Sequence, residues 1–433
     1  MNRQLEAEMD RDESETLAAL EAWPYRLGMG VYRMSISAFF AWGGLSQLKK
    51  KYKVGLNERM GEFGPGAPRG ALWVHAVSVG EVQSALSLLM AAKGLPHVLS
   101  TVTATGREMA EKLALSCADA MIYSPWDLPR FVNQALDALQ PKAYVAMETE
   151  RWPNMLAALR ERKIPAFLVN GRLSAESARK LQRMRRFWRG VLCCFERLLV
   201  RYDSDKEAFL NLGVPEGKII VTGDCKVDAM LARKDAVDAG KWTRLRRCRA
   251  PLFLAGSTHE GEDEAVFDAF GRVQKTFPAA RLVVVPRHPQ RAPRVAAAAQ
   301  AYGKTALLSA ETPDWDVLVV DKIGVLFELY SAVDAAFVGG SLVPKGGQNL
   351  MEPALFGVQA AHGPYMEDFP DTARMDRLGA SRTVMNAEDL ADAWLRAINP
   401  EEREWARRAC QKYLGSVGGA AQRCWDILCS RIS

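Results

Sequence analysis

The chain has 433 residues, of which 48% are hydrophobic and 25% are charged, and its formal net charge is +6. One hydrophobic core rarely grows beyond about 250–300 residues, so this length predicts two domains, and the composition excludes solenoid repeats and low-complexity chains. The eight cysteines form no CxxC pair and no Cys/His cluster, which excludes structural zinc and indicates reduced thiols in a cytosolic protein.

The N-terminal segment changes character twice. Residues 1–22 are acidic and polar, residues 27–45 (LGMGVYRMSISAFFAWGGL) are apolar and aromatic apart from Arg33, and residues 49–53 (KKKYK) are basic. The charge order excludes a cleavable signal peptide, and Arg33 argues against a bilayer span, which needs about 18 uninterrupted apolar residues. We therefore predict for residues 1–55 a tail and an interfacial helix on anionic lipid; the alternative is a helix docked on the protein's own core.

From residue 71 onward, short β-branched runs alternate with amphipathic helical segments. This alternation predicts an α/β fold in which helices cover both faces of parallel, doubly wound sheets. The expected strands are 71–77, 97–103, 120–125, 143–149, 165–171, 197–202, 218–224, 251–257, 280–287, 316–321, 335–341 and 358–364.

The domain junction is predicted between about residues 223 and 250, because the basic stretch that follows has little strand character. We predict one domain over residues 56–228 and a second over 250–400. Residues 401–433 are expected to form helices that can pack back on the first domain. Two such domains in tandem would enclose a cleft between the carboxyl edges of their sheets, where doubly wound folds bind ligands.

Polar clusters follow several of the expected strands. Any one of them can be a turn with a helix cap, and Glu81 in HAVSVGEV (75–82) can cap the helix that follows it. Together they predict working loops at the sheet edges. These clusters are HAVSVGE (75–81), ETERWPN (148–154), NGRLS (170–174), AGSTHEGEDE (255–264), VPRHPQR (285–291) and GGSLVPKGGQNLMEPALFG (339–357).

The clusters of the second half have the chemistry of a nucleotide site. In AGSTH (255–259) and GGQN (346–349), backbone N–H groups can face an anion. Glu352 can accept ribose hydroxyls, and Arg287 can neutralise phosphate charge. The sequence has no P-loop and no GxGxxG after a strand, which argues against an NTPase or a nicotinamide enzyme and favours a nucleotide-sugar.

These clusters, with GDCKVD (223–228), resemble in order and spacing the 3-deoxy-D-manno-octulosonic acid (Kdo) transferases of Gram-negative lipid A assembly. The resemblance runs from about residue 25 to about 415. It implies a GT-B glycosyltransferase fold with two Rossmann-like domains, and inverting transfer of Kdo from CMP-Kdo to the 6′-hydroxyl of a lipid A precursor, without metal or another cofactor. It also implies a peripheral or monotopic location on the cytoplasmic face of the inner membrane.

The resemblance also implies roles for individual residues. Glu81 matches the proposed general base, and Glu150 a second catalytic carboxylate. The implied donor-site residues are Lys226, Ser257, Thr258, His259, Arg287, Gly346, Gly347, Asn349 and Glu352, and the implied acceptor-site residues are Ser78, Gly80, Arg172 and Ser174.

Three positions depart from the family pattern. Asp224 replaces a common Asn, Val325 replaces a Glu expected near the nucleotide, and Gln348 replaces a frequent His. The first two leave donor specificity open, whereas Gln348 can still donate and accept hydrogen bonds.

The segment ARKLQRMRRFWR (178–189) carries six positive charges with apolar residues between them. It can be a solvated helix face or a surface for anionic lipid; no nucleic-acid module accompanies it, which argues against nucleic acid as partner. The rival functions are another nucleotide-sugar enzyme of the same fold, such as an epimerase, and a non-catalytic membrane-associated nucleotide-binding protein. The number of Kdo units added and the oligomeric state stay open.

Overall fold

The structure is a computed structural model that describes residues 2–64, 66–114, 117–238, 240–246, 250–310, 314–369 and 371–432. It divides into two compact units. Unit 1 consists of residues 1–229 and 418–433, and unit 2 of residues 230–417.

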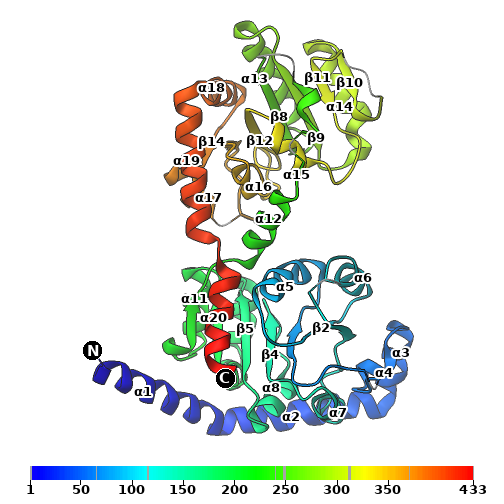
Figure 1. The fold of residues 1–433 in the computed structure, drawn as a ribbon, viewed down its shortest axis with the longest axis vertical. Helices are drawn as coiled ribbons and strands as arrows, with labels where there is room; N and C mark the ends of the chain where they lie inside the picture. Colours follow the sequence, from blue (N-terminus) through cyan, green and yellow to red (C-terminus); the bar gives the residue numbers. More distant parts are fainter. Residues whose placement is uncertain are drawn as a thin grey trace. The chain divides into compact units, whose positions relative to one another are not determined.

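Unit 1 is built on a seven-stranded sheet of strand order β3-β2-β1-β4-β5-β6-β7, in which every pair of neighbours is parallel (Figure 1). Its inner strands are buried throughout, as expected for a parallel sheet with both faces covered. The strands are β1 (Leu72–His75), β2 (His97–Thr101), β3 (Ala120–Tyr123), β4 (Ala143–Met147), β5 (Ala166–Gly171), β6 (Arg197–Val200) and β7 (Ile219–Val221).

Alternate residues of these strands belong to two hydrophobic clusters, one on each face of the sheet. Trp73 and Tyr144 lie on the first face, and their neighbours Val74 and Val145 lie on the second. The first face packs against α7 (Pro129–Leu139), α8 (Pro153–Glu161), α10 (Arg185–Cys193), α11 (Asp203–Asn211) and parts of α1 (Asn2–Glu21) and α2 (Trp23–Phe39). The second packs against α5 (Val79–Ala91), α6 (Ala104–Leu113) and α20 (Ala420–Ile432).

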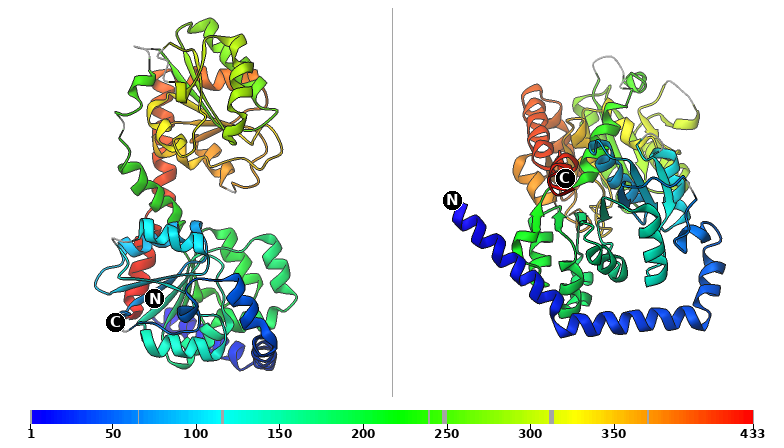
Figure 2. Two further views of the ribbon diagram at one scale, coloured as in Figure 1. Left: turned by 90° about the vertical axis from the view of Figure 1, so that its right-hand side faces the viewer. Right: turned by 60° about the horizontal axis from the view of Figure 1, so that its bottom comes forward.

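The N-terminal helices run along the outside of unit 1, where Figure 2 shows α1 and α2 meeting at an angle. A π-turn (Phe40–Gly44), with Gly43 at a φ of 94°, separates α2 from α3 (Leu45–Lys51), and α4 (Leu56–Arg59) follows. Tyr25 and Met29 of α2 are buried in the unit 1 core. A Cβ on Gly28 would lie 2.4 Å from the Phe187 ring of α10, so only glycine allows this close approach of the two helices.

Unit 2 repeats the architecture with a second all-parallel sheet, of order β10-β11-β9-β8-β12-β13-β14. Phe253 and Leu254 of its central strand again belong to different clusters on opposite faces. The strands are β8 (Leu252–Thr258), β9 (Arg281–Pro286), β10 (Thr305–Leu307), β11 (Val317–Val319), β12 (Ala335–Val338), β13 (Ala360–His362) and β14 (Ser381–Thr383).

The helices of unit 2 cover both faces of its sheet. One face packs against α13 (Asp263–Thr276), α14 (Ala292–Ala299) and α18 (Ala387–Ala397), and the other against residues 242–245 and α15 (Leu326–Leu329). The remaining helices are α16 (Met351–Leu355), α17 (Thr372–Leu378) and α19 (Pro400–Val417).

All twelve predicted strands are present, and the sequence missed β10 and β14. Both are three-residue strands at sheet edges, and neither carries the β-branched apolar run that marks β7 (Ile219–Val221), an edge strand of the same length that was predicted. The two units part inside α12 (Cys225–Asp235), within the predicted junction of 223–250. Residues 401–433, grouped together in the sequence analysis, are divided: most of them belong to α19 of unit 2 and α20 of unit 1. The predicted cleft between the domains stays a prediction.

Candidate functional site

Glu81 lies in the first turn of α5, directly beyond the carboxyl end of β1. The backbone N–H of Val77 donates to Glu81 Oε2 (2.7 Å) and the Ser78 hydroxyl to Oε1 (3.3 Å), while the N–H of Glu81 donates to Ser78 Oγ (3.4 Å). The arrangement resembles a capping box, except that Glu81 accepts from the N–H of Val77 and not from that of the N-cap residue Ser78, so Ser78 and Glu81 do cap the helix. Glu81 is buried, and burial raises the pKa of its carboxyl above the ordinary value. A cap and a base are compatible roles for such a group.

Glu148 is the buried carboxylate around which the charged groups of unit 1 gather. Lys226 Nζ lies 2.7 Å from Oε1, and Arg172 Nε lies 2.7 Å from Oε2. Burial works against ionisation of Glu148, but these two cations hold its pKa below the ordinary value. Its backbone is left-handed (φ 53°), a strained conformation that clusters at functional sites.

Glu150 shares a hydrogen-bond donor with His75. The indole N–H of Trp152 donates to Glu150 Oε2 (2.9 Å) and to His75 Nε2 (3.1 Å). Burial, reinforced by the charge of Glu81, raises the pKa of Glu150 to about 7. Burial also lowers the pKa of His75 to about 4, so the imidazole is neutral. Near neutral pH, Glu150 therefore holds a proton for about half of the time.

The remaining residues predicted for unit 1 lie on the same loops. Ser174 caps α9 (Ala175–Gln182) by accepting from the N–H of Ser177 (3.2 Å), and a Cβ on Gly80 would lie 3.9 Å from Lys226 Nζ. Asp224, the departure from the family pattern, accepts from the N–H of Lys226 (2.9 Å), and its other oxygen lies 3.7 Å from Arg201. Asp224 thus caps α12 and helps to orient the segment that carries Lys226.

In unit 2, the side chain of the fully buried Glu262 connects the loop of His259 with the loop of residues 340–342 by hydrogen bonds. Its Oε2 accepts from the N–H groups of His259 and Gly340 (both 2.8 Å), and its Oε1 from those of Ser341 and Leu342 (both 2.9 Å). From the sequence, the amides of AGSTH are expected to face a bound anion. The structure corrects this for His259, because a carboxylate of the protein itself occupies that amide.

The other predicted residues of unit 2 surround these loops. Ser257 has a left-handed backbone (φ 57°), and its carbonyl lies 3.1 Å from His259 Nδ1. The Thr258 carbonyl accepts from the N–H of Arg287 (3.0 Å), while the Arg287 side chain is exposed. The Thr258 side chain is buried.

The GGQN loop turns at two glycines with left-handed backbone, and Asn349 binds the first residue of the helix that follows. Gly346 and Gly347 have φ of 82° and 75°, and Asn349 Oδ1 accepts from the N–H of Met351 (2.9 Å) at the start of α16. Burial raises the pKa of Glu352 in that helix, and Arg233 opposes the rise. Val325, where a Glu was expected, precedes α15 and packs against the hydrophobic core.

Comparison with known proteins assigns the family. A family model described as 3-deoxy-D-manno-octulosonic-acid transferase (kdotransferase) matches residues 54–229. The 3-deoxy-D-manno-octulosonic acid transferase of Haemophilus influenzae is 31% identical over 405 residues, which cover 89% of this chain and 93% of that relative. This chain belongs to the Kdo transferase family. The Bordetella pertussis enzyme of the same name is also 31% identical, over 93% of this chain and 99% of its own length.

Solved structures support the fold of this Kdo transferase. A UDP-GlcNAc 2-epimerase from Neisseria meningitidis, bound to UDP-GlcNAc, superposes with a TM-score of 0.59 at 15% identity, covering 83% of this chain and 100% of that one. A glycosyltransferase from Rickettsia africae has a TM-score of 0.53 at 11% identity, covering 84% and 98%. The predicted α/β fold of GT-B type is confirmed. As a Kdo transferase, the protein is a glycosyltransferase of lipopolysaccharide biosynthesis.

Two central residues of this Kdo transferase were not selected from the sequence. In the sequence, Glu148 is only the neighbour of Glu150 in the cluster ETERWPN (148–154). Glu262 is only one of four acidic residues in AGSTHEGEDE (255–264). Their importance follows from their partners, which, apart from the neighbouring amide of His259, lie 24 to 80 positions away along the chain. The available signal was their place in polar clusters at the ends of expected strands, since Glu148 lies in the strand expected over 143–149 and Glu262 lies five residues after that of 251–257.

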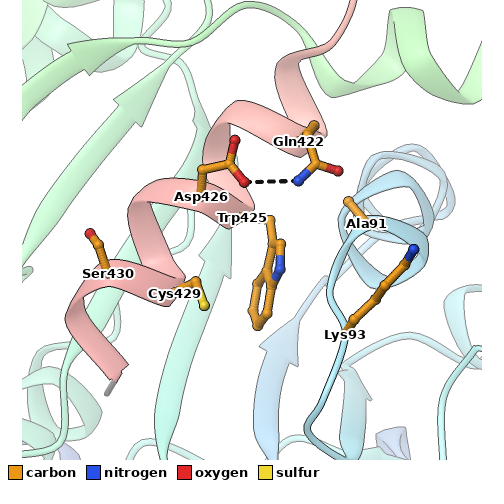
Figure 3. Close-up of a pocket in the computed structure, with 7 residues that line it drawn as sticks. All are labelled: Ala91, Lys93, Gln422, Trp425, Asp426, Cys429 and Ser430. Carbon is orange, nitrogen blue, oxygen red and sulfur yellow. Dashed lines mark hydrogen bonds between the residues drawn. The ribbon is translucent and has the colours of Figure 1, made fainter.

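A separate cavity of about 420 Å³ lies in unit 1 of the Kdo transferase, between the end of α5 and α20 (Figure 3). Gln422 donates to Asp426 (2.8 Å) across one turn of α20, and Trp425 lies between these residues and α5. None of the predicted site residues lines this cavity. Among the described residues, no group of three His, Cys, Asp or Glu side chains is arranged to hold a metal ion, and metal independence stays a prediction.

Proposed function

We propose that this Kdo transferase moves Kdo from CMP-Kdo to the 6′-hydroxyl of a lipid A precursor with inversion of configuration, and that Glu81 is the general base. The observation that carries the proposal is the environment of Glu81. Its carboxylate is buried at the carboxyl edge of the unit 1 sheet, beside a loop cluster in which Lys226 and Arg172 share Glu148.

Comparison of the three carboxylates supports this choice of base. Both oxygens of Glu148 are engaged by cations that lower its pKa, so it is a weak base. Glu150, whose pKa of about 7 also suits acid–base chemistry, is held by the Trp152 N–H, and we keep it as the second catalytic carboxylate. Glu81 has no cation within ion-pair distance among the described residues, and its raised pKa makes it a stronger base than a surface carboxylate.

In the proposed reaction, Glu81 takes the proton of the acceptor hydroxyl while that oxygen attacks the anomeric carbon of Kdo. The bond from this carbon to the phosphate oxygen breaks, and CMP leaves with the electron pair. Lys226 is partly exposed, so it retains N–H donors for the Kdo carboxylate, and the half-exposed Arg172 retains donors for the acceptor.

On the donor side, we assign CMP to unit 2. The exposed guanidinium of Arg287 suits phosphate, and Glu352 suits the ribose hydroxyls. Ser257, Thr258, His259, Gly346, Gly347 and Asn349 would line the same site. Glu262 would act indirectly, by holding the His259 loop and the 340–342 loop in one arrangement.

We also propose that the protein lies on the cytoplasmic face of the inner membrane. Among the described residues no helix is long and apolar enough to cross a bilayer. One face of α2 is docked: Tyr32 donates to Asp127 (2.9 Å) and Arg33 to Asn154 (3.1 Å). The opposite face leaves Trp23 and Met34 exposed, and Trp42 follows in the π-turn with 89% of its surface exposed. Lys49 and Lys50 are exposed nearby along the chain and suit anionic headgroups.

The test is incubation of the purified protein with CMP-Kdo and a tetraacylated lipid A precursor in detergent, with EDTA present. Mass spectrometry should show the precursor carrying added Kdo, and NMR should show inverted anomeric configuration. Retained configuration or dependence on a divalent metal would contradict the mechanism. Binding of CMP-Kdo without release of CMP would indicate the non-catalytic alternative, and turnover of a UDP-sugar instead would indicate another donor.

A further inference from the structure

The apolar face of α2 does not simply lie open to solvent. Together with residues 182–188 it forms a groove of about 770 Å³ in unit 1, which we call the α2–α10 groove. Its large apolar lining residues are Trp23, Leu27, Val31, Met184, Phe187 and Trp188. An exposed apolar groove of this size on a protein surface indicates a binding site.

The rim of the α2–α10 groove is cationic. Arg183, Arg185 and Arg186 line it, and all three are exposed. Within the described part of the chain, no carboxylate forms an ion pair with Arg183 or Arg186. An apolar floor with unneutralised guanidinium groups at its edge is complementary to an anionic amphiphile. The floor can bury the acyl chain of the amphiphile, and the guanidinium groups can pair with its headgroup.

The groove also adjoins the loop that carries Glu150. The Arg151 guanidinium lies 5.9 Å from the centre of the Trp188 ring, and Arg151 follows Glu150 directly in the chain. Through Trp188, the groove therefore lies next to the loop that carries Glu150.

We propose that the α2–α10 groove binds one acyl chain of the lipid acceptor, with the arginine rim on the acceptor's anionic headgroup. This inference rests on the proposed function, because it assumes that the acceptor is a lipid. The groove would distinguish acylated from deacylated acceptors and would orient the sugar toward the ETERWPN loop.

A kinetic test compares two substitutions on the same helix. Leu27 is 58% exposed and lines the groove, whereas Met34 is 72% exposed and lies outside it. Leu27→Asp therefore places a charge in the groove, and Met34→Asp places the same charge on the exposed surface of the same helix. Transfer is measured in detergent micelles with the tetraacylated precursor and with its deacylated sugar. The ratio of kcat/KM for acylated over deacylated acceptor should fall about tenfold in Leu27→Asp and stay at the wild-type value in Met34→Asp. Equal effects of the two substitutions would overturn the groove in favour of surface insertion alone.

A binding test is independent of turnover. A monoacyl phosphoglycerol with a brominated chain, used below its critical micelle concentration, should quench part of the tryptophan fluorescence. The quenching should be lost in the Trp23→Phe/Trp188→Phe variant and kept in Trp42→Phe. The zwitterionic phosphocholine analogue should bind more weakly, because it leaves the arginine rim without a counter-ion.

The two tests separate the failure of this inference from the failure of the proposed function. Quenching without any Kdo transfer would support lipid binding in the groove and contradict the proposed reaction. Transfer without quenching, with an unchanged acceptor ratio in Leu27→Asp, would support the reaction and contradict lipid binding in the groove.

Discussion

At the scale of single residues, the environment of Glu81 allows both a capping role and the proposed role of general base, which a sequence motif cannot separate. The carboxylate caps α5 through Val77 and Ser78, and burial makes it a better base. Replacing Glu81 by Gln should retain CMP binding and lower kcat about 10²–10⁴-fold, the usual contribution of a general base. Kinetics and CMP titration of the same sample check this. Gln preserves most of the hydrogen bonds that cap α5. Turnover near the wild-type level would therefore show that Glu81 caps the helix and is not the general base.

Glu150 gives the stability of unit 1 a pH dependence of predictable sign. Its pKa rises from 4.5 to about 7 on folding, so the folded state retains a proton that the unfolded state has lost. The stabilisation is complete below about pH 4.5 and is lost as the pH rises through about 7. Relative to Glu150→Gln, the wild type should lose about 3 kcal/mol between pH 5 and pH 8.

Urea denaturation of the wild type and Glu150→Gln at pH 5 and pH 8 checks this prediction. The free energy of unfolding is taken from the unfolding transition that the substitution shifts, which is that of the unit containing Glu150. A pH-independent difference would show that Glu150 is ionised throughout. His75 acts in the opposite direction, since its lowered pKa reduces stability as the pH falls from about 6.5 to about 4. The substitution isolates Glu150 because His75 is present in both proteins.

Glu262 is a positioning residue rather than a group that touches substrate. In Glu262→Gln, an NH₂ group would face two backbone N–H donors that now share one oxygen, and each unsatisfied donor costs about 1–3 kcal/mol. CMP affinity should fall at least about tenfold, measured by calorimetry. Glu260→Gln is the matched control, because Glu260 is exposed and its one ion pair among the described residues is with Arg294. A lowered Tm with unchanged CMP affinity would place the nucleotide away from these loops.

At the scale of elements, α2 is docked on unit 1 by one face, as the alternative for residues 27–45 predicted, and the interfacial role of its other face stays a prediction. Tyr25 and Met29 dock the helix on unit 1, and the opposite face exposes Leu27 and Met34. Arg33, which argued against a bilayer span, bonds Asn154 on the docked side. Deletion of this segment would therefore open the unit 1 core, and surface substitutions give the cleaner test.

Replacing Met34 and Trp42 together by Ser should lower partition into phosphatidylglycerol vesicles about tenfold without lowering the Tm, because both side chains are exposed. Co-sedimentation measures the partition, which should weaken with added salt. The control replaces Ile323 and Met385, exposed apolar residues of unit 2, by Ser. Equal loss in both variants would show non-specific adsorption instead of docking through α2 and the π-turn.

At the scale of the whole molecule, unit 1 is completed by the last helix of the chain. Cys424, Trp425 and Leu428 of α20 are buried on the second face of its sheet. Arg423 donates two hydrogen bonds to the Thr222 carbonyl (2.9 and 2.7 Å), and Asp228 accepts from the N–H groups of Gly419 and Ala421. The chain thus returns to the unit in which it began.

Deleting residues 418–433 should destabilise unit 1 by about 3–5 kcal/mol, since it exposes the surface that these side chains cover. Hydrogen exchange should rise in α5 and β7 and stay unchanged in β8 and α13 of unit 2. Trp425→Ala should reproduce part of the change without truncation. Uniform exchange across both units would mean that α20 contributes to global rather than local stability.

The sequence by itself determined the class of this protein, twelve of the fourteen strands that the structure describes, and the loops that carry the candidate site. These features are local: β-branched runs, turn residues and ordered motifs are written in consecutive positions. Only the tertiary structure decided which carboxylate is neutralised by Lys226 and Arg172, which amides Glu262 occupies, and which face of α2 is docked. Burial and ion pairing depend on residues far apart in the chain, and their effects on pKa and exposure arise only when folding brings those residues together.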